Sequence, residues 1–141
     1  AQVEHLLVHE SGLLGLSGIS SDMRTLREKE AGSPAAARAL SYYAYRVARE
    51  AGSLAAALGG LDALVFTAGI GENDRALRAD VCGRLGWLGI GLDELANARA
   101  GGGGQPARIS RGGAVPVWVV PTNEELMIAR HTRAVLAQTG L

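Results

Sequence analysis

The sequence predicts an α/β protein in which short parallel strands alternate with helices. Two apolar runs, 63–67 and 115–120, are bounded by turn residues, which is typical of strands covered on both faces. Around them lie segments in which apolar residues recur every three or four positions, as on one face of a helix. Strands that alternate with helices favour a doubly wound α/β layer. Ligands of such layers bind at the carboxyl ends of the strands.

The longest predicted helix has clear signals at both ends. Ser33 and Pro34 mark its start, because proline at the first helical position loses no hydrogen bond, and Gly59 and Gly60 mark its end. Small and apolar side chains recur along it as one stripe, at Ala37, Leu40, Ala44, Val47, Ala51, Leu54 and Leu58. Because many of these positions are alanine, we expect this helix to pack closely on its neighbours.

The other segments are assigned by the same signals. Four further helices are expected, over 3–10, 22–28, 75–85 and 123–137. Ser20 or its neighbour Ser21 is expected to cap the second of these, and Asn123 the last. Residues 11–20 are predicted to form a loop or short strand, 87–90 a short strand, and the glycine run 101–104 a flexible loop.

Composition excludes several classes of partner. The chain of 141 residues carries fourteen basic and fourteen acidic residues, without a basic cluster interleaved with aromatic residues, so nucleic acid is not an expected partner. No apolar run approaches the ~20 residues that span a bilayer, so no membrane partner is expected. The single cysteine, Cys82, excludes an internal disulfide and suits a reducing compartment. We therefore expect one cytoplasmic domain over residues 1–141.

The segment after the first apolar run is the main candidate for a binding site. Gly69 and Gly71 lack a Cβ atom, so the backbone can turn sharply there and approach a ligand closely. Asn73 or Asp74 can cap the helix expected from residue 75, whose free N–H groups would then face a phosphate or nucleotide. An ordinary strand-to-helix connection is the alternative, since short glycine patterns are common.

Two pairs of charged residues have both structural and functional interpretations. Glu124 and Glu125 fall in the first turn of the last helix, where carboxylates favour the helix dipole, but a carboxylate there could also bind Mg²⁺. Asp22 and Arg24 stand at a predicted helix start. Both could be solvated, or Arg24 could stack on a purine or pair with phosphate. Spacing alone does not decide between these alternatives.

Three longer motifs, taken in order, resemble the acetate kinase family in its carboxyl-terminal portion. They are SGLLGLSGISSDMR over 11–24, FTAGIGEN over 66–73 and PTNEEL over 121–126. The similarity extends over nearly the whole chain, from about residue 11 to residue 133. The resemblance implies a partial ribonuclease-H-like α/β domain of the actin and sugar-kinase superfold, with a short parallel sheet and packed helices. It also implies reversible phosphoryl transfer between ATP and acetate.

The resemblance assigns roles to residues of all three motifs. Asp22, Met23 and Arg24 would border the adenine and ribose of ATP or ADP. The nucleotide would be wrapped from the other side by the segment Gly69, Ile70, Gly71, Glu72 and Asn73. Glu124 would be the carboxylate that binds magnesium, with Glu125 the less favoured candidate. Ala68 stands where many members of the family carry glycine, a change that the turn should tolerate.

The length of the chain departs from the family. Members have several hundred residues, and their amino-terminal domain supplies the acetate pocket and the Arg, His and Asp residues that stabilise the transferring phosphoryl group. The resemblance therefore implies a single incomplete carboxyl-terminal nucleotide-binding domain, a truncated or fragmentary product, with no catalytic residue of its own. It would meet acetate or acetyl phosphate only together with the other half.

Two alternatives to an acetate kinase part remain open. A propionate or butyrate kinase fragment is one, because the acyl pocket that separates these activities lies outside this sequence. A non-catalytic association module is the other, since a sheet that lacks strands leaves an edge able to pair. We expect a homodimer or a complementary domain as the partner in that case.

Overall fold

The computed structural model describes residues 2–102 and 104–139. Gly103, inside the predicted flexible loop, lies outside them, as do Ala1, Gly140 and Leu141. The elements in chain order are α1 (Gln2–His9), α2 (Gly12–Ser17), α3 (Met23–Lys29), η1 (Glu30–Gly32), α4 (Pro34–Leu58), β1 (Leu64–Phe66), α5 (Ala68–Asn73), α6 (Arg75–Arg84), η2 (Gly86–Leu88), α7 (Glu94–Arg99), β2 (Ala107–Arg108), β3 (Val117–Val119) and α8 (Glu124–Thr139).

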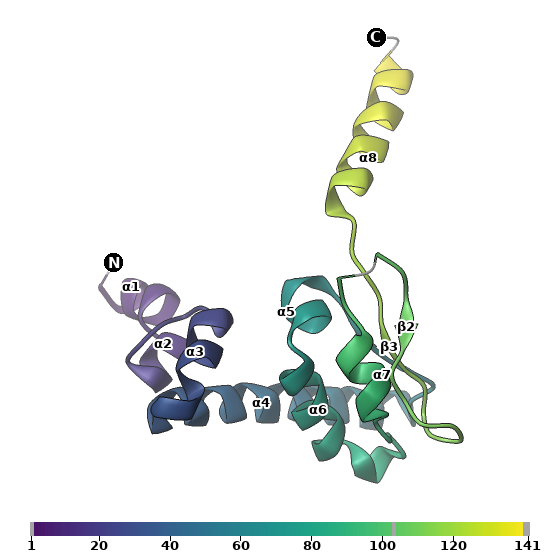
Figure 1. The fold of residues 1–141 in the computed structure, drawn as a ribbon. Helices are drawn as coiled ribbons and strands as arrows, with labels where there is room; N and C mark the ends of the chain where they lie inside the picture. Colours follow the sequence, from purple (N-terminus) through teal and green to yellow (C-terminus); the bar gives the residue numbers. More distant parts are fainter. Residues whose placement is uncertain (1, 103, 140–141) are drawn as a thin grey trace.

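The long helix α4 is the base on which the other elements are arranged. Helices α1, α2 and α3 lie towards one end of α4, α5 and α6 lie over its middle, and the sheet with α7 lies at the other end (Figure 1). Both predicted ends of α4 are confirmed. The Ser33 hydroxyl accepts a hydrogen bond from the Ala36 N–H at 3.2 Å, and Gly59 closes the helix with a φ of 75°.

The predicted stripe on α4 is only partly buried. Leu40 and Ala44 are buried in the core, but Leu54 and Leu58 are 64% and 78% exposed. The buried face of α4 continues past Ala48 through Ala51, which packs against the core cluster, to Ala55, which is buried, whereas Leu54 and Leu58 lie on the exposed side.

The small sheet confirms the predicted α/β class and its parallel strand pair. Its order is β1-β3-β2, and β1 runs parallel to β3 with Val65 opposite Trp118. Strand β2 pairs antiparallel with β3, with Ala107 opposite Val119. No strand was predicted over β2, because two residues are too few to show an alternating pattern.

Three local predictions were wrong. Residues 11–20 contain the helix α2, which ends at Gly18 in the left-handed conformation with a φ of 64°. Residues 87–90 contribute to the short 3₁₀ helix η2 and a single β-bridge between Ile90 and Val115. Helix α3 is capped by Asp22, not by either serine. These elements are too short for periodicity to distinguish them.

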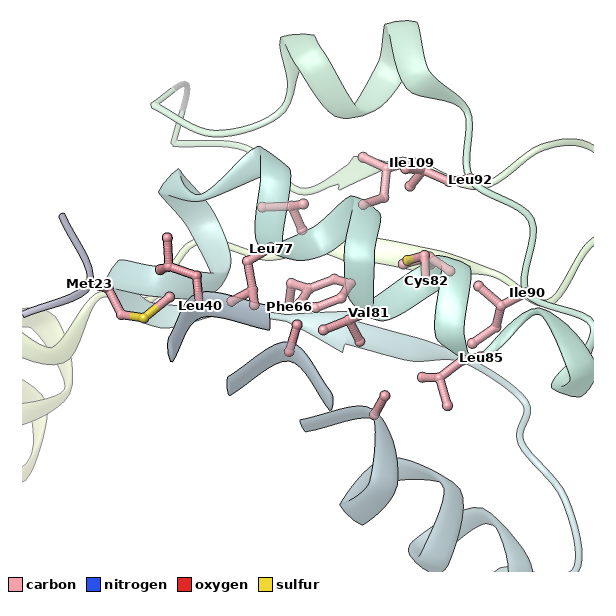
Figure 2. Close-up of a cluster of buried hydrophobic side chains, with 14 of the residues drawn as sticks. Met23, Leu40, Phe66, Leu77, Val81, Cys82, Leu85, Ile90, Leu92 and Ile109 are labelled. Carbon is pink, nitrogen blue, oxygen red and sulfur yellow. The ribbon is translucent and has the colours of Figure 1, made fainter. Parts of the chain in front are cut away.

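The hydrophobic core joins α3, α4 and α6 to the sheet. Phe66, at the end of β1, lies between Leu77 and Val81 of α6, as Figure 2 shows. Met23 and Leu40 extend the core at one side. The end of β1 is thereby fixed against α6, and this positions α5 at the carboxyl edge of the sheet.

Helix α8 extends away from this body, in yellow in Figure 1. Asn123 Oδ1 accepts a hydrogen bond from the Leu126 N–H at 2.9 Å, so the predicted cap is confirmed. Side chains from 124 to 138 are exposed. Within the described residues, no helix is long and apolar enough to cross a membrane.

Candidate functional site

A cleft of about 830 Å³ separates the start of α3 from α5 and the start of α6. Asp22, Met23 and Arg24 line one wall. Gly69, Ile70 and Asn73 line the other. The structure therefore brings together two segments that lie more than forty residues apart in the sequence, and both were candidates for nucleotide contact.

The α3 wall of the cleft presents an exposed cation, Arg24. Asp22 Oδ1 accepts a hydrogen bond from the Thr25 N–H at 2.7 Å, and this bond lowers the pKa of Asp22. Met23 is only 8% exposed, so most of its side chain belongs to the core. The Arg24 side chain is exposed, and its guanidinium makes no hydrogen bond or ion pair within 2–102 and 104–139, although its charge helps to lower the pKa of Asp22. Its guanidinium is available for a planar ring or a phosphate.

The α5 wall differs from the predicted glycine turn, because residues 68–73 form a short helix. Gly69 is open to the cleft, and a Cβ atom there would meet nothing within 4 Å. At Gly71, by contrast, a Cβ atom would lie 3.2 Å from the carbonyl carbon of Phe66. Gly71 is buried and does not line the cleft, so its tight packing against β1 favours a glycine there.

The sequence offered either Asn73 or Asp74 as the cap of α6, and the structure gives this role to Asp74. Asp74 Oδ1 accepts a hydrogen bond from the Leu77 N–H at 2.9 Å, so Asp74 is the cap of α6. The exposed amide of Asn73 donates to the Gly69 carbonyl at 2.8 Å, within α5. The side-chain oxygen of Asn73 thus remains able to accept a hydrogen bond from a ligand.

An ion pair sets the separation of the two walls. Arg27 Nη2 of α3 lies 2.9 Å from Asp74 Oδ2 at the start of α6, and Arg27 Nη1 lies 2.9 Å from Glu30 Oε2. Because Asp74 also caps α6, this one carboxylate connects α3, α6 and the end of α5. This ion pair therefore joins the two walls of the cleft.

Besides Gly71, two predicted site residues lie outside the cleft wall. Glu72 faces away from it, and its Oε1 accepts hydrogen bonds from the backbone N–H and the hydroxyl of Thr122, both at 2.9 Å. Glu124 is the first residue of α8. In residues 2–102 and 104–139, no group of three or more His, Cys, Asp or Glu side chains could hold a metal. A single carboxylate fits Mg²⁺, which takes its remaining ligands from phosphate and water.

Arg78 was not among the predicted site residues, although it is the largest fully buried side chain in the described part of the chain. Its guanidinium donates to the carbonyls of Gly71 at 2.9 Å and Glu72 at 2.8 Å, and to Asn97 Oδ1 at 2.7 Å. These bonds satisfy the carboxyl end of α5 and fix it to α7. The available signal for its burial was its spacing, because Arg78 lies three residues before the apolar Val81 and so on the same face of α6.

The comparisons with known proteins agree with these motifs. The sequence profile of the acetokinase family matches residues 1–130. The chain belongs to the acetokinase family. It is 56% identical over 131 residues to an acetate kinase of Rhodopseudomonas palustris, which covers 92% of this chain and 32% of that relative. An acetate kinase of Deinococcus deserti is 54% identical over 142 residues, covering 99% of this chain and 35% of the relative.

Solved structures of the family share the fold. Porphyromonas gingivalis acetate kinase has a TM-score of 0.84 at 40% identity, covering 95% of this chain and 34% of that one. A propionate kinase of Francisella tularensis has a TM-score of 0.80 at 36% identity, covering 91% and 32%. The chain thus spans about a third of the length of the relatives it matches.

Proposed function

We propose that this chain is the ATP-binding part of an acetate kinase, a phosphotransferase that moves a phosphoryl group reversibly between ATP and acetate. The observation that carries the proposal is the cleft, in which Arg24 of α3 faces Gly69 and Asn73 of α5. Residues of two motifs that resemble the acetate kinase family, 11–24 and 66–73, line this cleft. We regard residues 1–141 as one incomplete carboxyl-terminal nucleotide-binding domain.

Each wall of the cleft has a distinct role in this proposal. Arg24 stacks on the adenine or pairs with a phosphate, with Asp22 and Met23 beside it. Gly69 allows the ligand to approach the α5 backbone, Ile70 gives the wall an exposed apolar side chain, and Asn73 accepts a hydrogen bond from the ligand. Gly71 and Glu72 act indirectly, because they shape and anchor α5.

Glu124 is the proposed protein ligand of magnesium. Mg²⁺ bound with ATP neutralises the charge that develops on the transferring phosphoryl group. Glu124 opens α8 and is exposed, so its carboxylate is free to reach a hydrated ion. We keep Glu125 as the second candidate in the same turn.

We further propose that the 141-residue chain does not make acetyl phosphate by itself. Phosphoryl transfer depends on cations positioned around the moving group. The cleft wall holds Arg24, Arg27 and Arg75, but Arg27 is already paired with Asp74 and Glu30. Incubation of the purified chain with Mg·ATP and acetate, with acetyl phosphate trapped as hydroxamate, should give no product. Acetyl phosphate formed by the chain alone would contradict this.

Calorimetric titration with Mg·ATP tests the binding site. We expect Asn73→Ala to weaken binding by about threefold to tenfold, the value of one hydrogen bond. The matched control is Gln138→Ala, which removes an exposed amide near the far end of α8 and should leave the affinity unchanged. Equal affinities of the wild type and Asn73→Ala would remove α5 from the site.

A second candidate function is a non-catalytic association module. Exposed apolar side chains favour it, among them Leu6 and Leu7 on α1 and Met127 and Ile128 on α8. Burying such surface in a homodimer or against a complementary domain would be favourable. Light scattering over a range of concentrations tests it, and a stable monomer throughout would count against it. The propionate kinase likeness keeps a longer acyl substrate as a further alternative.

A further inference from the structure

Glu72 connects the nucleotide segment to the segment that carries Glu124. It lies on α5 immediately before the cleft residue Asn73, but its carboxylate points to Thr122. One oxygen, Oε1, accepts both the backbone N–H and the hydroxyl of Thr122, each at 2.9 Å. Hydrogen bonds to an ionised carboxylate are stronger than those between neutral groups.

The position of Thr122 gives this contact its importance. Thr122 precedes Glu124 by two residues and lies at the base of α8. The segment between β3 and α8 also contacts the end of β1, nearer to β3, where the Val120 N–H donates a hydrogen bond to the Phe66 carbonyl at 2.9 Å. The hydrogen bonds to Glu72 are nearer in the chain to α8, and this helix extends away from the body (Figure 1).

We propose that Glu72 is a positioning residue that holds the base of α8, and with it Glu124, in a fixed relation to the nucleotide segment. The inference rests on the proposed function, because it takes Asn73 to meet the nucleotide and Glu124 to meet magnesium. Glu72 and Asn73 are consecutive residues of one six-residue helix. A ligand that orders Asn73 therefore also orders Glu72, and through it Thr122.

The ionised state of Glu72 supports this role at neutral pH. The hydrogen bond from the Thr122 N–H lowers the pKa of Glu72, with a further contribution from the Thr122 hydroxyl. The carboxylate is therefore charged at neutral pH, and its Oε1 accepts both hydrogen bonds. Glutamine in its place keeps an oxygen that can accept both donors, whereas alanine keeps none.

The test compares binding of ATP with and without magnesium by the full 141-residue chain. In Glu72→Ala, we expect the affinity for Mg·ATP to fall about tenfold, as for loss of a group that orients a metal ligand. Affinity for ATP in EDTA should change by less than about twofold, because the cleft wall is untouched. Glu72→Gln should retain most of the Mg·ATP affinity.

Further variants test the contact between Glu72 and Thr122 and control for the loss of a carboxylate charge. Thr122→Val removes one of the two donors and should lower Mg·ATP affinity by about threefold. Combined with Glu72→Ala it should add little, because the two residues act as a pair. Glu94→Ala is the matched control, since it removes an exposed carboxylate from the first turn of another six-residue helix.

Each outcome bears on a specific claim. Equal losses for Mg·ATP and metal-free ATP in Glu72→Ala would mean that Glu72 contacts the nucleotide itself, and would overturn the positioning role. An unchanged Mg·ATP affinity, with faster hydrogen exchange at the Thr122 amide, would show that the contact exists without coupling, and would also overturn it. A wild-type chain that binds neither form would overturn the proposed function, and this inference with it.

Discussion

Ala68 begins α5 in a conformation that glycine adopts without strain. Its φ of 59° makes it the one non-glycine residue with positive φ in the described chain. For an L-residue with a Cβ atom, the left-handed region costs about 1–2 kcal/mol. Glycine removes that cost but loses about 0.5–1 kcal/mol more conformational entropy on folding. We therefore expect Ala68→Gly to raise the free energy of unfolding by about 0.5–1 kcal/mol, against the usual direction of such a change.

The measurement is urea denaturation followed by tryptophan fluorescence, for which Trp118 in β3 is a reporter within the body. Ala56→Gly, on an exposed part of α4, is the control and should lower stability by about 0.5–1 kcal/mol. The same chemical change is thus expected to have opposite signs at the two positions. A loss of stability in Ala68→Gly equal to that in Ala56→Gly would refute the strained start of α5.

Three further predictions follow from buried or anchored groups. Arg78→Met should lower stability by about 3–5 kcal/mol, because it leaves buried carbonyls without donors, whereas Arg38→Met on exposed α4 surface should change it by less than about 0.5 kcal/mol in the same urea assay. Burial raises the pKa of Cys82 to about 11, so Ellman's reagent should label it only on unfolding, and immediate labelling in native buffer would contradict its burial. The pKa of Glu72 is lowered on folding, so the ionised carboxylate contributes fully to the free energy of unfolding above the ordinary pKa of 4.5, and this contribution is lost as the pH falls through the lowered pKa. The difference in unfolding free energy between wild type and Glu72→Gln should therefore shrink in acid. A difference that does not change with pH would contradict this role of the carboxylate.

Local chemistry accounts for what could be predicted of the fold. The ends of α4 follow from Ser33, Pro34 and Gly59, whose roles depend only on neighbouring residues. The cap at Asn123 is of the same kind. The two parallel strands have long enough apolar runs to be recognised. By contrast, α2 and β2 are short elements whose conformations depend on tertiary contacts, which the sequence pattern does not contain.

In the candidate site, too, the features that depend on tertiary contacts could not be predicted from local sequence patterns. That Arg24 and Asn73 face one cleft could not be obtained from spacing, because α4 and β1 separate them in the chain. The family resemblance supplied that pairing. Arg78 was missed because an arginine is ordinarily solvated, and only the carbonyls of α5 and α7 explain its burial. The contact between Glu72 and Thr122 joins residues fifty positions apart and carries no sequence signal.

Photolabelling with 8-azido-ATP tests the central claim, that the cleft between α3 and α5 binds the nucleoside end of ATP. The chain would be irradiated with the probe and Mg²⁺, with and without excess ATP, and the labelled peptides identified by mass spectrometry. We predict ATP-protected label in the peptides that contain Asp22–Arg24 or Gly69–Asn73. Protected label confined to other surfaces, such as the exposed tyrosines Tyr42 and Tyr45 of α4, would contradict the account.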